Sequence, residues 1–101
     1  MVASEEPMVL CQNPESNEPG IEIARWKYDL MSRVILEVVS QNSEGIGIFD
    51  LPKLIDRRLT REERSGLGSV AWYAIIVKLD LEARGEIERV PQSRPERVRR
   101  R

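Results

Sequence analysis

The chain has 101 residues, of which 41% are hydrophobic, so its length suits one small domain rather than two. It contains one cysteine and no histidine, which excludes an internal disulfide and removes the residue that proteins use most often as a zinc ligand or general base. No apolar run approaches the roughly 20 residues that span a bilayer, and the first ten residues lack the pattern of a signal peptide. We therefore expect a cytoplasmic protein with no membrane partner, no metal, no cofactor and no enzymatic site.

The formal net charge of −1 hides an uneven distribution along the chain. Residues 1–24 hold five glutamates and no basic residue, whereas residues 94–101 hold five arginines against Glu96. An arginine-rich end can bind nucleic acid, because each phosphate that it neutralises releases counterions. It can equally be a hydrated tail, since runs of like charge repel and stay solvated. Both interpretations stay open at this point.

The segment 1–20 is rich in Glu, Pro, Asn and Ser and has little apolar surface to offset the entropy of ordering. We expect an extended or flexible acidic arm there, followed by a winged-helix domain over residues 21–101. Within the arm, Met8-Val9-Leu10 is an apolar group that predicts a short strand docked on the body.

Helical periodicity predicts a first helix from about Ala24 to Val39, with Met31, Val34, Ile35 and Val38 on one apolar stripe. A break at residues 41–45 follows, and the alternation over 46–49 predicts a short strand that ends at Phe49. Asp50 is expected to cap the next helix with its carboxylate, and Pro52 suits a first helical turn.

That second helix is expected over residues 51–59. Thr60 and Glu63 then have the spacing of a capping box, which predicts one further turn ending near Gly66. A third main helix should begin at Gly68 or Ser69 and reach Arg84, with Gly85 as its left-handed C-terminal residue. Alternating segments over 86–90 and 96–100, joined by the turn residues 91–95, predict a hairpin.

The order helix, short strand, helix, helix and hairpin predicts a mainly α fold with a small β-hairpin, the winged helix-turn-helix. The end of the third helix, Leu81-Glu-Ala-Arg-Gly-Glu-Ile-Glu-Arg89, also resembles the junction between helix and wing in bacterial winged-helix regulators. Such a junction is a property of the fold first, because glycine permits the reversal of the chain and Ile87 packs beneath the helix.

A closer resemblance covers most of the chain. The segments that carry it are Val9-Leu10, Asn13-Pro14, Pro19-Gly20, Lys27-Tyr-Asp-Leu-Met31, Ala71-Trp-Tyr-Ala74, Val77 and Leu79-Asp-Leu-Glu-Ala-Arg-Gly85. Together they resemble a family of small bacterial proteins of unknown function. The sequence departs from that family at Tyr73, where members carry a second tryptophan, and at Ile75 and Ile76, where they often carry polar residues. The resemblance implies a fold and a bacterial cytoplasmic setting, and it implies no activity.

The third helix is apolar on two sides. Its core stripe is predicted to hold Val70, Ala74, Val77 and Leu81, and its opposite face holds Trp72, Ile75, Ile76 and Leu79. That opposite face offers none of the hydrogen-bonding side chains that read base edges in the major groove. A helix that is apolar all round is usually buried on both sides. We expect either the N-terminal arm or a second copy of the chain, in a homodimer, to cover it.

Two groups of arginines are the candidates for contacts to duplex DNA of low sequence specificity. They are Arg57, Arg58, Arg61 and Arg64 in the helix-turn-helix region, and Arg94, Arg97, Arg99 and Arg100 in the hairpin. Asp56, Glu62 and Glu63 interleave with the first group, which favours a hydrated surface of mixed charge. The sequence therefore supports two hypotheses: a DNA-binding regulator by analogy of fold, and a non-enzymatic interaction or dimerisation module that uses the apolar face of the third helix.

Overall fold

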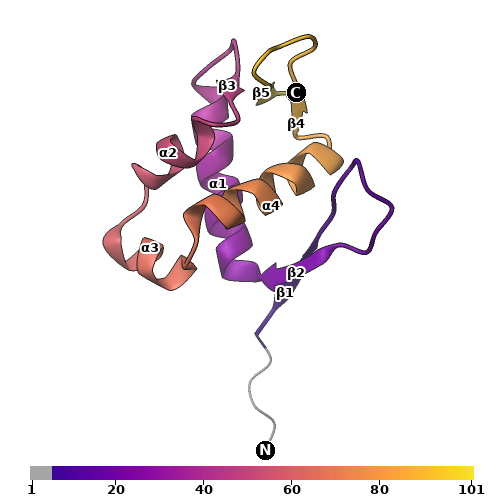
Figure 1. Ribbon diagram of the computed structural model, residues 1–101. Helices are drawn as coiled ribbons and strands as arrows, with labels where there is room; N and C mark the ends of the chain where they lie inside the picture. The colour runs from indigo at the N-terminus through magenta and orange to yellow at the C-terminus, as the bar shows by residue number, and fades with distance from the viewer. Residues whose placement is uncertain (1–5) are drawn as a thin grey trace, which may run out of the picture.

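The computed structural model describes residues 6–101 of the chain. Within this range the chain forms four helices and five strands around one core, and the strands make up two small antiparallel sheets (Figure 1). In chain order they are β1 (Met8–Cys11), β2 (Ile21–Ala24), α1 (Arg25–Ser40), β3 (Ile46–Gly47), α2 (Leu51–Asp56), α3 (Arg61–Leu67), α4 (Val70–Ala83), β4 (Ile87–Arg89) and β5 (Arg97–Arg100). The fold is thus α+β, and its helices and C-terminal hairpin follow the predicted order.

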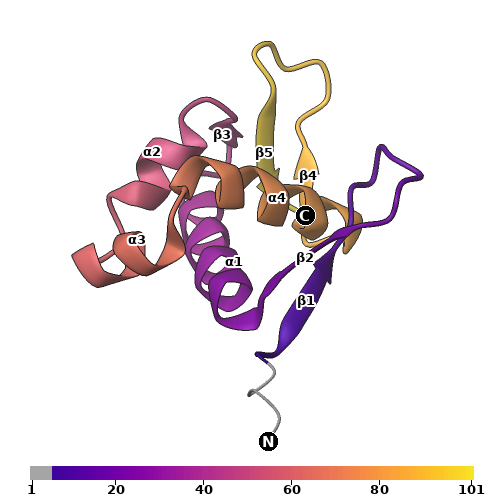
Figure 2. The ribbon, with the colours of Figure 1, turned by 60° about the horizontal axis from the view of Figure 1, so that its bottom comes forward.

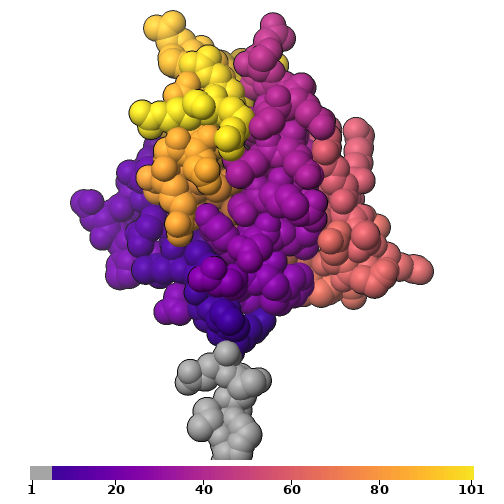
Figure 3. Space-filling model, turned by 180° about the vertical axis from the view of Figure 1, so that it is seen from behind, coloured from indigo at the N-terminus to yellow at the C-terminus, as the bar shows by residue number. Residues whose placement is uncertain are grey.

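The core lies between α1 and α4, which cross at the centre of the molecule (Figure 2). The predicted stripe of α1 is confirmed, because Met31, Val34, Ile35 and Val38 are all buried. Seen from behind, α1 runs between the C-terminal hairpin on one side and α3 on the other (Figure 3). The core stripe of α4 is confirmed for Ala74, Val77 and Leu81, while Val70 is only partly buried.

Helix α2 is shorter than predicted and ends at Asp56 rather than Leu59. The amides of Arg58 and Leu59 donate to carbonyls three residues back, at 2.9 and 3.2 Å, and this tighter winding turns Leu59 into the core. The expected side-chain cap from Asp50 was wrong, because Asp50 has helical dihedral angles and its side chain accepts no capping bond. Pro52 does stand in the first turn of α2, as predicted.

The starts of α3 and α4 follow the predicted chemistry. Thr60 accepts from the Glu63 amide at 3.0 Å, and the Glu63 carboxylate accepts from the Thr60 amide at 2.8 Å, which completes the capping box. Ser69 caps α4 by accepting from the Trp72 amide at 3.1 Å. Helix α4 ends at Ala83, one residue before the predicted end, and Gly85 has the left-handed φ of 76° expected of it.

The second sheet has the order β3-β5-β4, with Val98 paired to both Ile46 and Arg89. The predicted C-terminal hairpin is confirmed, although its two strands are shorter than predicted. Strand β3 holds only two residues, because the Asp50 amide donates to the Gly47 carbonyl at 3.0 Å and turns the chain. Phe49, expected as the end of this strand, therefore lies outside the sheet.

The N-terminal segment is more ordered than an extended arm. The predicted strand at Met8-Val9-Leu10 is present as β1, and it pairs in antiparallel register with Ile21–Ala24 across the boundary expected at residue 20. Local bonds order the loop 12–20: the Glu15 amide donates to Asn13 and the Glu18 amide to Ser16, at 2.9 and 3.0 Å. The same polar residues that suggested disorder thus act as turn formers. Residues 1–5 of the expected arm lie outside the described range.

Among residues 6–101, no helix has both the length and the apolar character that crossing a membrane requires.

Candidate functional site

The apolar face predicted on α4 is divided in two. Ile76 and Leu79 are half-buried and line a hollow beneath the loop 12–20, together with Cys11, Pro19 and Ile21. We call this pair the covered patch. Trp72 and Ile75 remain 44% and 54% exposed. The N-terminal hairpin therefore covers only the side of α4 that carries Ile76 and Leu79.

Phe49 belongs to the exposed part, although it was not among the site residues predicted from the sequence. Its side chain is 72% exposed and lines a hollow of about 310 Å³ together with Ile75. We call Phe49, Trp72 and Ile75 the open patch. Because the chain turns between Gly47 and Asp50, strand alternation does not set the direction of Phe49, and no local pattern in the sequence marked its exposure.

The hollow beside the open patch has an apolar lining. It lies between α2 and α4, and its walls are Ile48, Phe49, Leu51, Pro52, Ala74, Ile75 and the Lys78 side chain. The Lys78 ammonium forms ion pairs with Glu82 at 2.8 Å and with Glu96 at 3.2 Å. The hollow thus suits an apolar side chain, and its walls present no free nucleophile or acid–base pair.

A buried carboxylate holds the N-terminal loop over the covered patch. Asp80 of α4 is fully buried and accepts from the Gln12 amide at 2.9 Å, the Tyr28 hydroxyl at 2.6 Å and Arg84 Nε at 2.5 Å. These bonds join the N-terminal loop, α1 and α4 at one point. Burial, together with the bond to Asp80, raises the pKa of the Tyr28 hydroxyl. Burial raises the pKa of the neighbouring Cys11 thiol to about 11, so the thiol stays protonated and unreactive at neutral pH.

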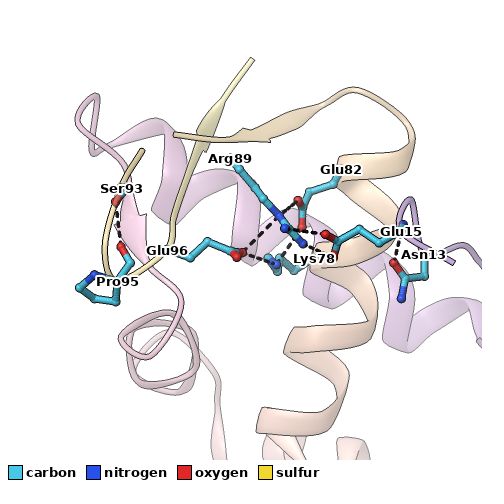
Figure 4. Close-up of polar contacts among 8 residues, drawn as sticks. All are labelled: Asn13, Glu15, Lys78, Glu82, Arg89, Ser93, Pro95 and Glu96. Atoms are coloured by element: carbon cyan, nitrogen blue, oxygen red, sulfur yellow. Dashed lines mark hydrogen bonds and ion pairs between the residues drawn. The ribbon is translucent and has the colours of Figure 1, made fainter. Parts of the chain in front are cut away.

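A second polar network ties the loop 12–20 to the C-terminal hairpin (Figure 4). Arg89 of β4 donates to Glu15 at 2.8 and 2.5 Å and to Glu82 of α4 at 2.9 Å, and it lies 3.3 Å from Glu96. The bond from Arg89 lowers the pKa of the Glu15 carboxyl, and the bond to Glu15 raises the pKa of Arg89. The network fixes the outer end of the loop.

The arginines of α2 and α3 are engaged to different degrees. Arg64 donates to the Asp56 and Leu59 carbonyls at 3.1 and 2.9 Å, where it satisfies the end of α2. Arg58 bonds to Gln41 and lies 3.8 Å from Glu37. Arg57 and Arg61 are exposed, and Arg57 borders a shallow depression with Lys53 and Ala71.

The arginines of the C-terminal hairpin form a separate group. Arg99 pairs with Glu88 across the strands at 2.8 Å, and Arg97 donates to the Glu44 carbonyl at 3.5 Å. Arg94, Arg97 and Arg100 are exposed. Figure 1 shows β3 between α2 and the C-terminal hairpin, and α3 on the far side of the molecule from the hairpin, so the structure does not join the two predicted arginine groups into one cluster.

Within residues 6–101, no group of three Cys, Asp or Glu side chains is arranged to hold a metal ion.

The chain belongs to a family of unknown function (DUF6958), whose model matches residues 8–98. Searches of curated proteins and of solved structures find no match. The resemblance to a family without a known activity is thereby confirmed, and the matched range includes β1, the first strand of the N-terminal hairpin. The geometry of the site is therefore the basis for inferring what it does.

Proposed function

We propose that this protein is a non-enzymatic interaction module of winged-helix architecture, and that the open patch is its binding surface. The element order supports the architecture: α1, β3, α2, the helices α3 and α4, and the hairpin β4–β5 follow one another as in a winged helix-turn-helix. The single cysteine, Cys11, is free and buried, so the fold uses no internal disulfide and is compatible with a reducing compartment such as the bacterial cytoplasm.

One observation carries the proposal: a large aromatic and an aliphatic side chain stand in solvent on either side of an apolar hollow. Phe49 is 72% exposed and Ile75 is 54% exposed, and they line the same hollow. Complete burial of one such side chain contributes about 1.5–3 kcal/mol, so leaving both exposed forgoes a substantial gain. Contiguous apolar surface of this kind is typical of a protein-binding site.

Site-specific photo-crosslinking tests the proposal. A benzoylphenylalanine replaces Ile75, and a matched variant carries it at Glu62, which is exposed on α3. We expect irradiation in the cells that express the protein to give covalent protein adducts at position 75 that are absent at position 62. Their composition is then determined by mass spectrometry. If position 75 gives no adduct beyond the level at position 62, the open patch is not a binding surface.

The exposed arginines of the C-terminal hairpin support DNA binding as a second candidate function. Arg94, Arg97 and Arg100 stand in solvent on one hairpin, as contacts to phosphates would require. The exposed side chains of α4 include Ala71, Trp72 and Ile75, none of which reads bases by hydrogen bonds. Binding through the hairpin is therefore expected to be electrostatic, micromolar or poorer at physiological salt, and tolerant of sequence.

Fluorescence anisotropy with a mixed-sequence duplex tests this candidate across a series of salt concentrations. Replacement of Arg97, Arg99 and Arg100 by alanine should lower both the affinity and its dependence on salt, whereas Ile76→Ala should change neither. The candidate fails if the protein with all its arginines binds no duplex at low salt.

A further inference from the structure

We propose that the free edge of β1 is a second binding surface, which takes a basic, extended segment of a partner protein as an added strand. This surface belongs to the N-terminal hairpin and is separate from the open patch. Figure 2 shows β1 on the side of β2 that faces away from α1, and within residues 6–101 β1 pairs with no strand other than β2. Three properties support the proposal: unpaired backbone groups, exposed apolar side chains and acidic surroundings.

The register of the hairpin shows which backbone groups of β1 are free. The Arg25 amide donates to the Pro7 carbonyl at 2.8 Å, which marks these two residues as a hydrogen-bonded pair. Such pairs alternate with pairs that are not hydrogen-bonded, so the odd-numbered residues of β1 bond to β2. Met8 and Leu10 therefore point their amide and carbonyl groups to the other edge, where they have no partner within residues 6–101. An incoming strand can pair with these groups.

The side chains of the same two residues are exposed. Met8 and Leu10 are 45% and 47% exposed, whereas the alternate residues Val9 and Cys11 pack toward the core. Natural edge strands are commonly protected against added strands by charged residues or proline. Strand β1 contains neither. An added strand would cover Met8 and Leu10 with its own side chains and so gain cross-strand contacts besides the backbone bonds.

The surroundings of the edge are acidic. Residues 6–24 contain four glutamates and no lysine or arginine. Glu15 pairs with Arg89, whereas Glu6, Glu18 and Glu22 are exposed and form no ion pair within residues 6–101. The hairpin thus presents three carboxylates that a basic partner can neutralise.

Two arginines flank the hairpin without removing this acidic character. Arg84, near the Gln12 end of the edge, donates to the buried Asp80 at 2.5 Å, so its charge is already paired. Arg25 stands opposite Pro7 at the other end and forms no ion pair with any of the three glutamates. Three unpaired carboxylates against one unpaired guanidinium leave the hairpin acidic.

The exposed face of the hairpin sets the order of side chains in the added strand. Glu6 is two residues before Met8, so alternation places it on the face that carries Met8 and Leu10, and Glu22 lies beside Leu10 in β2. A basic side chain opposite Glu6 makes a cross-strand ion pair. A basic side chain opposite Leu10 can lay its methylene stem on Leu10 and extend its charge toward Glu22. The expected segment therefore has a basic, an apolar and a basic residue at alternate positions.

A second copy of the chain is a poorer occupant of this edge. It would bring together two hairpins that each carry the same three unpaired glutamates, and like charges in neighbouring strands are destabilising. A basic segment gains from these charges instead. The backbone bonds alone would admit any extended segment, so the charges select among partners.

Two synthetic peptides test the proposal by NMR on the full, nitrogen-15-labelled chain. The probe is Thr-Lys-Thr-Val-Thr-Arg-Thr with blocked ends, and its control has glutamate in place of lysine and arginine. The basic peptide should shift the amide resonances of Met8 and Leu10 with a Kd on the order of 1 mM, as expected for a few backbone hydrogen bonds. The acidic peptide should bind at least about tenfold more weakly.

Three variants separate the backbone and the charge contributions. Leu10→Pro removes an outward amide but no bond to β2, so it should abolish binding while the melting temperature shows that the chain is folded. Glu6→Lys with Glu22→Lys should reverse the preference between the two peptides. Ile75→Ser, in the open patch, is the control and should leave the shifts of Met8 and Leu10 unchanged.

The proposal is overturned if neither peptide shifts Met8 and Leu10 in the unchanged chain, or if both peptides shift them with equal affinity. It is also overturned if these two resonances move with protein concentration in the absence of peptide, because a second copy then occupies the edge. Since the open patch takes no part in this experiment, either result leaves the proposed function to be decided by crosslinking at position 75.

Discussion

The two apolar patches of α4 differ in what lies over them, although the sequence presents them as one face. Ile76 and Leu79 lie under a polar loop that Asp80 and Arg89 hold in place. Within residues 6–101, no such segment lies over Trp72 and Ile75, and Ile75 lines a hollow together with Phe49. In this protein the part of the apolar face that is closed from within the chain is the part over which polar groups hold a covering segment. The open patch is the surface that we propose for a partner.

Deletion of the N-terminal segment that lies over Ile76 and Leu79 should have the largest effect on the difference between the two patches. Deletion of residues 1–20 removes β1, the buried Cys11 side chain and the Gln12 donor to Asp80, and it exposes the covered patch. The loss of a buried side chain and a buried hydrogen bond should cost several kcal/mol, so we expect the melting temperature to fall by roughly 10 °C or more. Thermal unfolding followed by circular dichroism measures it. An unchanged melting temperature would mean that the hairpin adds nothing to the stability of the body.

The next largest effect should come from the carboxylate that holds the cover. Asp80→Ala leaves the Tyr28 hydroxyl and the Gln12 amide without their acceptor in a buried position, and each such group costs about 1–3 kcal/mol. Urea unfolding should show a loss of several kcal/mol. Asp50→Ala is the control, because the Asp50 side chain makes no capping bond and should change stability only slightly. Equal losses in the two variants would contradict the role assigned to Asp80.

A matched pair of substitutions compares the two patches directly. Leu79→Ser removes a half-buried side chain under the loop and should destabilise the monomer by about 1–2 kcal/mol. Ile75→Ser acts on a side chain that is 54% exposed, so it should cost the monomer less than about 0.5 kcal/mol. Ile75→Ser should instead abolish the homodimer that was expected from the sequence, as measured by light scattering. Unfolding measured at low protein concentration separates the two effects, and a greater loss of monomer stability from Ile75→Ser would reverse the comparison.

The smallest effect concerns pH and the outer end of the cover. The folded pKa of Glu15 is lowered from its ordinary 4.5 by the bond from Arg89, so its contribution to stability is complete above pH 4.5 and is lost as the pH falls through the lowered value. Amide hydrogen exchange in the loop 12–20 should therefore accelerate in this acidic window, beyond the intrinsic change with pH. Glu15→Gln should abolish the acceleration, while Glu18→Gln should preserve it. If Glu15→Gln leaves the pH dependence unchanged, another group holds the loop.

The helices were predictable because their signals are local. The stripe of α1, the capping box at Thr60 and the left-handed Gly85 each depend on residues within one or two helical turns. The end of α2 was not predictable from local signals, because it depends on Arg64. This side chain donates to the carbonyl groups of residues five and eight positions earlier. A polar residue that caps from the next helix leaves no periodic signal.

Only part of the site was predicted, because only some of its residues have local signals in the sequence. Trp72 and Ile75 followed from the helical periodicity of α4, and β1 followed from its apolar composition. The split of the face required knowing that Asp80 accepts from Gln12, at a separation of 68 residues, and that Arg89 reaches Glu15. The sequence also did not place Phe49 beside Ile75, because α2 and α3 separate them along the chain.

Fluorescence of Trp72 provides the most direct test of the homodimer that was expected from the sequence, as an occupant of the open patch. In a Trp26→Phe variant, Trp72 is the remaining tryptophan, and its emission reports the environment of the open patch. Burial against a partner subunit predicts blue-shifted emission at high protein concentration, and a red shift on dilution through the dimer Kd. Emission that is red-shifted and independent of concentration over the whole range would contradict the account.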